Sequence, residues 1–351
     1  MGELSPRGHF GDAFPVRRSA GAPRATTPWR RYLWSEFVPL PELASPALLS
    51  TLAARGIGLR AAVYPDDLGK VASVRRAFDR AGVELGLWPL LRDRDGRWGS
   101  CDNAEAFSAH ALDAARAAGE PAPAMVLDLE PPIGRVRAAL RGRLAGPRGS
   151  GARWPHGTRE LAALAKALRR RAARVGLAAI PAVVADAKTA GWQRALGTPV
   201  HFLHSDHVSV MAYSTLLEGY SRGALRRVDA ERLLFWLSVS ALRRYGARAG
   251  VSLGVVGSGA LGDEASYRHP SELAEDVAVA QAGGARALGL YGLDGILARP
   301  PVEAWLAVFA GSGAACERAP PALTWRARAV AAALTAGSPL LSALFRAATR
   351  G

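Results

Sequence analysis

Two carboxylates at the end of a short apolar stretch are the residues of this sequence best placed to do chemistry. The stretch covers residues 124–130, and Asp128 and Glu130 stand two positions apart at its end. Because neighbouring side chains of a strand point to opposite faces, both acids lie on one face. Close carboxylates in a poorly solvated site tend to include one with a raised pKa, beside an ionised partner. We therefore expect Glu130, at the tip, to be a general acid and Asp128 to support the reacting group.

The opposite face of the same stretch is apolar and predicts helices packed against it. Met125, Leu127 and Leu129 alternate with the acids. An apolar strand that ends in acids fits a parallel sheet covered by helices, which tolerates acids mainly where a strand runs out into a site. The residue pattern leaves a second interpretation open, in which the two acids only bind a substrate or hydrogen-bond neighbouring loops.

Further acids and aromatic rings follow the other predicted strands at the same end. The carboxyl ends of barrel strands meet at one face, where barrel enzymes keep their active sites. Acids suit proton transfer and hydroxyl recognition, and flat rings suit the apolar faces of a sugar. We therefore expect a poly- or oligosaccharide substrate, and the expected substrate-binding residues are Glu36, Tyr64, Trp88, Asp186, Met211, Tyr291 and Asp294.

The elements that must position these residues alternate strand and helix along about 280 residues. Such alternation predicts an α/β fold and favours a closed (β/α)8 barrel over residues 29–311, rather than a doubly wound sheet. Strands are expected at 32–37, 58–64, 83–90, 124–130, 177–185, 207–213, 251–256 and 287–291. Helices are expected at 46–55, 70–81, 102–118, 136–144, 158–175, 229–245, 271–282 and 301–309.

The two ends of the chain differ from the barrel in composition. Residues 1–28 contain no apolar run and predict a disordered tail without a signal peptide, which favours the cytoplasm by default, although a polysaccharide substrate would suggest export. Residues 312–351 predict a linker and a helical extension, which is either one extra helix or a helical pair broken at Gly337 and Pro339. Its uncharged segment 329–345 could anchor in a membrane, but packing against the barrel is the preferred interpretation.

Composition argues for a globular protein and against several classes of partner. Hydrophobic residues make up 49% of the chain, and the formal charge is +15. The basic residues are almost all arginine, which resembles a codon bias more than a nucleic-acid surface. Cys101 and Cys316 are too far apart in sequence to suggest a disulfide framework or metal site. His201, His204 and His207 lie on the approach to a predicted strand rather than at its carboxyl end, which argues against a zinc site. No metal or cofactor is expected, and the oligomeric state is left open.

Two short motifs resemble the chitinase-like barrels of glycoside hydrolase family 18. They are Asp128-Leu129-Glu130 at the end of the fourth strand and Met211-Ala212-Tyr213 on the sixth. The resemblance implies that Glu130 protonates the glycosidic oxygen. It also implies that Asp128 steadies a substrate acetamido group acting as nucleophile, and that Tyr213 supports this group.

The sequence departs from that family at positions that keep other functions open. Ser214 stands where the family has Asp, and Tyr291 is the nearest substitute for its tryptophan on the eighth strand. A non-catalytic carbohydrate-binding barrel is therefore an alternative. Gly257, Gly259 and Gly262 match a G-x-G-x-x-G fingerprint. The motif has two interpretations: a flexible loop that contacts the substrate, or a phosphate site, so a phosphate- or flavin-binding barrel is a further alternative function.

Overall fold

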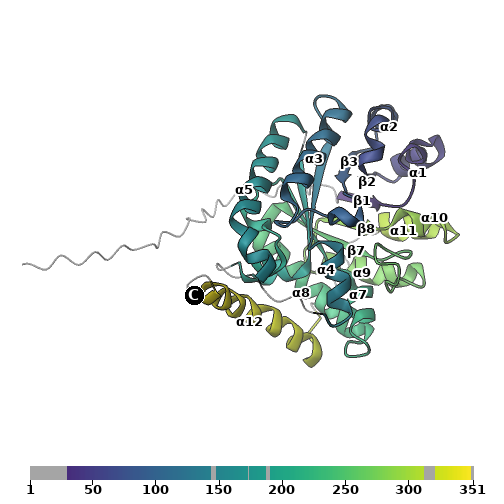
Figure 1. Ribbon diagram of the computed structural model, residues 1–351. Coiled ribbons are helices and arrows are strands. Elements are labelled where there is room, and N and C mark those ends of the chain that lie inside the picture. The colour runs from purple at the N-terminus through teal and green to yellow at the C-terminus, as the bar shows by residue number, and fades with distance from the viewer. Residues whose placement is uncertain (1–29, 144–147, 173, 187–189, 312–320, 349–351) are drawn as a thin grey trace, which may run out of the picture.

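The protein folds into a closed barrel of eight parallel strands that follow one another in chain order (Figure 1). The computed structural model describes residues 30–143, 148–172, 174–186, 190–311 and 321–348. Strand β8 pairs with β1 and closes the barrel, which confirms the predicted (β/α)8 fold. The strands are β1 (Arg30–Ser35), β2 (Ile57–Val63), β3 (Leu85–Pro89), β4 (Ala124–Leu129), β5 (Val175–Ala179), β6 (His207–Met211), β7 (Ala249–Gly254) and β8 (Ala287–Tyr291).

Helices cover the outside of the barrel, and local signals fix their ends. The Ser45 side chain caps α1, and Gly82 ends α2 in the left-handed conformation that glycine adopts without a Cβ clash. The helices are α1 (Pro46–Ala54), α2 (Leu68–Ala81), α3 (Ala104–Ala118), α4 (Ile133–Leu140), α5 (Arg148–Arg171), α6 (Gly191–Leu196), α7 (Ser214–Tyr220), α8 (Arg227–Tyr245), α9 (Pro270–Ala282), α10 (Leu293–Leu297), α11 (Val302–Ala310) and α12 (Trp325–Ala348).

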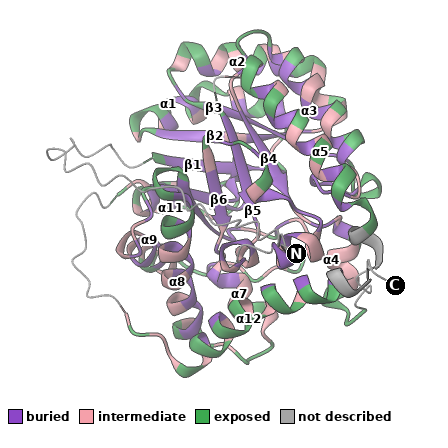
Figure 2. Cartoon of the chain, turned by 90° about the vertical axis from the view of Figure 1, so that its left-hand side faces the viewer, coloured by how far each residue is buried: buried purple, intermediate pink, exposed green. Residues whose placement is uncertain are grey.

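Each strand has one face toward the helices and one toward the barrel interior, and Figure 2 shows the strands as buried. On β4, Met125, Leu127 and Leu129 belong to the large core between strands and helices, whereas Val126 belongs to a separate inner cluster. The predicted division of this strand into an apolar outer face and an acidic inner face is confirmed. The alternation places Asp128 inside the barrel.

A layer of hydrogen-bonded side chains fills the barrel interior below the carboxyl ends of the strands. The Tyr32 hydroxyl lies 2.9 Å from His207 Nε2 and 3.0 Å from Ser209 Oγ. Trp34 Nε1 donates to Ser252 Oγ over 2.9 Å, and the Oγ atoms of Ser209 and Ser252 lie 2.7 Å apart. This layer is buried and fills the barrel interior beneath the strand ends.

Strand β5 is shorter than the sequence predicts, and this displaces a predicted site residue. The strand ends at Ala179, and Pro181–Ala185 forms a 3-10 helix in place of the expected continuation to residue 185. Proline cannot donate a ladder hydrogen bond and is favoured at the first turn of a helix, which explains the early end. Asp186 therefore follows a helical turn instead of a barrel strand.

The C-terminal extension is one helix on the outside of the barrel. Of the two predicted alternatives the single helix is confirmed and the break at Gly337 and Pro339 is not, because α12 runs through both residues. Pro339 has no N–H group to donate to the backbone carbonyl of Thr335. Because Thr335 is exposed, water can donate to this carbonyl instead. The preferred packing is confirmed by the contacts of α12 with α6 and α8. The predicted tail, residues 1–28, and most of the predicted linker, 312–320, lie outside the described residues.

Candidate functional site

A cavity of about 220 Å³ opens at the carboxyl ends of the strands, above the layer of hydrogen-bonded side chains that contains Tyr32 and Trp34. On the same measure a single water needs only about 10–15 Å³, so the cavity has room for a small organic group. The lining residues are Trp34, Glu36, Trp88, Trp98, Asp128, Glu130, Val136, Leu140, Ala178, Ile180, Pro181, Met211, Tyr213, Leu216, Tyr220, Ala260, Leu261, Glu264 and Tyr291.

The cavity brings together most of the residues expected from the sequence. Three of them, Asp128, Glu130 and Tyr213, are the expected catalytic residues, and four expected substrate-binding residues join them. These four come from four different strand ends and are Glu36, Trp88, Met211 and Tyr291. Trp98, in the loop after β3, also lines the cavity.

Asp128 is buried beneath the cavity with an oxygen atom that no described residue satisfies. Its side chain belongs to a residue only 2% exposed, and Oδ1 has no hydrogen-bond partner among the described residues. Burial is the main cause that raises the pKa of Asp128 to about 8, and the charge of Glu36 raises it further. The indole nitrogen of Trp88, also buried and unsatisfied, lies close enough to lower this pKa by a smaller amount. Neither atom makes a hydrogen bond of good geometry, although the indole nitrogen is close enough to the Asp128 carboxyl group to act on its pKa.

Glu130 lies one residue beyond β4 and is held there by its backbone. Its N–H donates to the carbonyl of Gly99 over 3.2 Å, while the N–H of Gly99 donates to the carbonyl of Asp128 over 2.8 Å. Burial first, then the charges of Asp128 and Glu36, raise the pKa of Glu130 well above its usual value. This rise in pKa favours the protonated form of the carboxyl group at the cavity.

Glu36 is occupied by protein partners. Arg97 Nε donates to its Oε1 over 2.8 Å, and a second guanidinium nitrogen reaches the same oxygen. The Tyr291 hydroxyl donates to Oε2, and the Tyr64 hydroxyl reaches Oε1 at 3.4 Å. Both the ion pair and the hydrogen bonds are buried. We conclude that Glu36 holds Tyr291 in place and contributes negative charge near Asp128.

Aromatic rings form much of the cavity wall. Trp34 and Trp88 meet edge to face with centroids 4.9 Å apart, and Trp88 meets Tyr291 in the same way at 6.3 Å. The rings of Tyr213 and Tyr291 are stacked, with centroids 5.9 Å apart. Edge-to-face and stacked contacts stabilise such clusters and fix ring orientation. The cavity therefore presents rigid apolar surfaces beside the acids.

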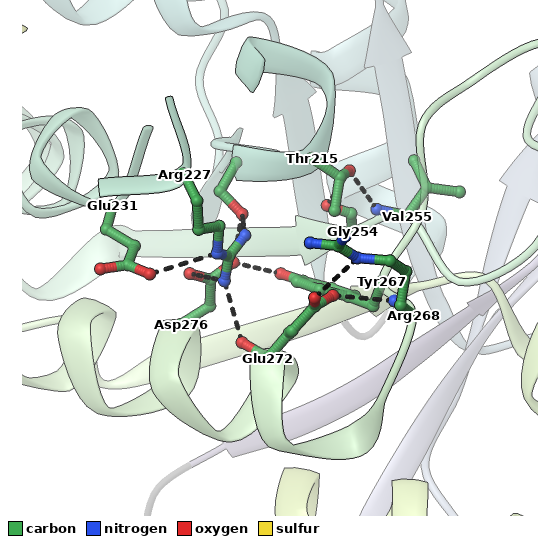
Figure 3. Close-up of polar contacts among 10 residues, drawn as sticks. Thr215, Arg227, Glu231, Gly254, Val255, Tyr267, Arg268, Glu272 and Asp276 are labelled. Atoms are coloured by element: carbon green, nitrogen blue, oxygen red, sulfur yellow. Dashed lines mark hydrogen bonds and ion pairs between the residues drawn. The ribbon is translucent and has the colours of Figure 1, made fainter. Parts of the chain in front are cut away.

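A buried polar network behind the cavity supports the helix that follows Tyr213 (Figure 3). Ser214, where the family 18 motif has Asp, donates to Asp276, and Tyr267 donates to the same carboxylate. Arg227 Nη2 pairs with Asp276 Oδ1 over 2.7 Å, and its Nη1 donates to Ser214 Oγ over 2.8 Å. Ser214 is fully buried, so its hydroxyl serves this network rather than the cavity.

Three predicted substrate-binding residues lie outside the cavity lining. Asp186 accepts hydrogen bonds from the backbone N–H groups of Trp192 and Gln193, at 2.8 and 2.9 Å, and so caps α6. Asp294 lies in the first turn of α10, where backbone N–H groups bind its carboxylate. Tyr64 does not line the cavity, but its hydroxyl contacts Glu36, which does. In the described structure, the first two carboxylates hold helix ends.

Trp34 and Glu264 are two of the lining residues that the sequence did not predict. Trp34 lies on an inward position of β1, which the alternation of side chains along a strand could have indicated. Glu264 lies in the loop after β7, and burial raises the pKa of its carboxyl group to about 7. Gly259 makes room for it, because a Cβ atom there would lie 1.1 Å from Glu264 Oε2. Because Glu264 lies in a loop, no helix or strand periodicity in the sequence indicates that its side chain faces the cavity.

The glycine motif of that loop does not open a helix. Gly257, Gly259 and Gly262 all have positive φ angles, and the next helix begins only at Pro270. A phosphate site of the fingerprint type needs the N-terminus of a helix directly after the glycines. The motif therefore shapes a loop beside the cavity.

The described residues contain no group of three or more His, Cys, Asp or Glu side chains arranged to hold a metal ion. The histidines near β6 have structural partners instead. His201 Nδ1 lies 2.7 Å from Gln193 Nε2, and His207 contacts Tyr32. Burial lowers the pKa of both imidazoles to about 4, so both are neutral at pH 7.

No family model and no curated protein matches the chain. Among solved structures, the glycoside hydrolase domain of PgaB (BpsB) from Bordetella bronchiseptica is 18% identical with a TM-score of 0.49, covering 80% of this chain and 99% of that one. A family GH18 chitinase from Cycas revoluta is 13% identical with a TM-score of 0.45, covering 80% and 98%. A D-allulose 3-epimerase from Methylomonas sp. is 11% identical with a TM-score of 0.44, covering 80% and 91%. At these values the likeness carries no argument about activity.

Proposed function

We propose that the protein is a glycoside hydrolase-like barrel that binds a sugar unit in the cavity and cleaves a glycosidic bond by acid catalysis from Glu130. The observation that carries this proposal is the position of Glu130. Its carboxyl group stands at the cavity, where burial raises its pKa well above the usual value, beside the unsatisfied oxygen of Asp128. A general acid must hold its proton at the working pH and release it to the leaving oxygen.

Asp128 and Tyr213 are proposed to position the reacting sugar. Oδ1 of Asp128 can accept a hydrogen bond from a hydroxyl or amide group of the ligand, because no described residue occupies it. A hydrogen bond made there removes the cost of a buried unsatisfied oxygen, so binding is favoured over an empty site. Tyr213 lines the same cavity and offers a phenolic hydroxyl.

The aromatic wall is proposed to bind the apolar faces of the sugar. Trp88 and Tyr291 are both almost fully buried and held edge to face, so they present fixed surfaces. Met211 adds a flexible apolar side chain to the lining. Rigid rings with a few polar groups are typical of small-molecule sites that fix ligand orientation. Tyr64 and Glu36 are assigned a supporting role through the contact with Tyr291.

A non-catalytic carbohydrate-binding barrel is the second candidate, and a specific observation favours it. Acid-base catalysis usually needs two groups whose pKa values are pushed apart. Here burial raises the pKa of both Asp128 and Glu130, so neither offers a ready carboxylate base in the free protein. A bound sugar acetamido group could supply the nucleophile in the enzyme, whereas a binding protein needs none.

Turnover of a panel of aryl glycosides and oligosaccharides, together with sugar binding by calorimetry, tests the proposal. We expect Glu130→Gln to lower turnover by on the order of 100- to 10,000-fold while sugar binding persists. The matched control is Glu105→Gln, an exposed acid on α3 that should behave as wild type. Sugar binding without turnover in any variant assigns the barrel to the binding class, and full activity of Glu130→Gln removes Glu130 from the mechanism.

A further inference from the structure

The side of α12 that faces away from the barrel is mainly apolar, with Arg328 and Thr335 exposed along one margin. We call it the outer face of α12. Its residues recur every three or four positions, which places them on one side of a helix. The three large side chains are Trp325, Leu340 and Leu344, exposed by 67%, 62% and 53%. The outer face consists of Trp325, Ala329, Ala332, Ala333, Ala336, Leu340, Ala343 and Leu344.

The opposite side of α12 attaches the helix to the barrel through small residues, the buried ring of Phe345 and a hydrogen bond. Ala327, Ala331 and Ser338 are buried there. Trp192 Nε1 donates to the Leu334 carbonyl over 2.7 Å, and Gly191 lies so close that a Cβ atom would stand 2.0 Å from the Ser338 carbonyl oxygen. A surface helix normally turns its larger apolar residues toward the core. In α12, Phe345 is buried in this way, but Leu340, Leu344 and Trp325 face outward.

The charged residues of α12 and of the segments next to it in the sequence are arginines, of which Arg326 lies 3.9 Å from Asp229 of α8. Residues 318–351 contain five arginines and no acidic residue, lysine or histidine. Two of the arginines stand at the start of the helix and two stand at or beyond its end, and the whole chain carries a formal charge of +15. A second copy of this chain would bring the same arginines against one another, which disfavours self-association through this face. An anionic surface is complementary at both ends of the helix.

We propose that the outer face of α12 binds an anionic lipid bilayer, with the helix lying in the interface plane. By length and composition, α12 could also cross a membrane. A spanning helix, however, would lose the contacts with α6 and α8 that hold its other side. Lying on the bilayer buries Leu340 and Leu344 and keeps these contacts, and tryptophan at position 325 suits the headgroup region.

Co-sedimentation of the full chain with vesicles tests this proposal. The vesicles are equimolar phosphatidylglycerol and phosphatidylcholine, or phosphatidylcholine alone. We expect binding to the anionic vesicles that weakens as salt is raised, and much weaker binding to the neutral ones. Leu340→Glu/Leu344→Glu should lower partitioning to the anionic vesicles by about tenfold or more, because both charges would enter the apolar layer.

The matched control is Leu242→Glu/Leu297→Glu, which makes the same charge change at two exposed leucines outside α12. It should bind nearly as wild type, and circular dichroism should show both double variants folded. Equal binding of wild type and Leu340→Glu/Leu344→Glu overturns the proposal, as does absence of binding to the anionic vesicles. Dimerisation that only Leu340→Glu/Leu344→Glu abolishes, without vesicle binding, assigns the face to a second copy and also overturns it.

Discussion

The ring of Tyr213 is stacked on the ring of Tyr291, with an angle of 8° between their planes. The two tyrosines come from the ends of β6 and β8 and share one cavity wall. Their hydroxyls differ: that of Tyr291 donates to Glu36, whereas that of Tyr213 has no hydrogen-bond partner among the described residues. Two similar rings therefore differ in their hydroxyl groups, one bound to a protein carboxylate and one without a described protein partner at the cavity.

Removal of each hydroxyl group should therefore have a different effect. Tyr291→Phe takes a donor from the buried Glu36 carboxylate, and we expect the free energy of unfolding to fall by about 1.5–3 kcal/mol. Tyr213→Phe removes no protein hydrogen bond, so we expect little change in stability but weaker sugar binding or turnover. Urea denaturation and ligand titration of both variants provide the measurements. Loss of stability in Tyr213→Phe, with none in Tyr291→Phe, would contradict the assignment.

The barrel and its acid pair were predictable because both leave a local pattern in the sequence. Buried parallel strands are short apolar runs, and strand alternation alone places Asp128 and Glu130 on one face. The same alternation on β6 puts Val208 and Val210 toward the helices and Ser209 inside, as the structure confirms.

Features that depend on tertiary contacts were not predictable in this way. Asp186 was assigned to the site because β5 was extended past Pro181, and the carboxylate instead caps a six-residue helix too short to show periodicity. Glu264 reaches the cavity through a loop with no regular repeat. Arg97, which holds Glu36, follows a turn in the loop after β3, and only the folded chain brings the two residues together.

Gly259 should be required for the position of Glu264. Gly259→Ala would place a methyl group where Glu264 Oε2 lies, and its φ of +66° is already unfavourable for alanine. We expect a loss of at least about 1 kcal/mol of stability and a clear loss of ligand binding. Gly262→Ala is the matched control, because its φ is +85° but no atom lies within 4 Å of the added Cβ. Equal ligand binding by the two variants would show that Glu264 does not contribute to the site.

The raised pKa of Asp128 should make the protein less stable as pH rises. The folded chain holds this proton up to about pH 8, whereas an unfolded aspartate loses it near pH 3.9. Between these values the native state binds more protons than the unfolded state, so the free energy of unfolding falls with increasing pH. Across the whole interval between the two pKa values, the free energy of unfolding falls by on the order of 5 kcal/mol at most.

Asp128→Asn should remove this dependence, because asparagine resembles the protonated acid in shape and cannot ionise. We expect the variant to match wild type near pH 4 and to be more stable by several kcal/mol at pH 8, with the difference growing steadily between these values. Urea denaturation at pH 4, 6 and 8 measures this difference in the free energy of unfolding. The control is Asp113→Asn on the exposed face of α3, which should stay within about 0.5 kcal/mol of wild type at each pH. A difference between Asp128→Asn and wild type that does not grow with pH would mean that Asp128 is ionised in the folded protein, and the proposed protonated pair beneath the cavity would then be wrong.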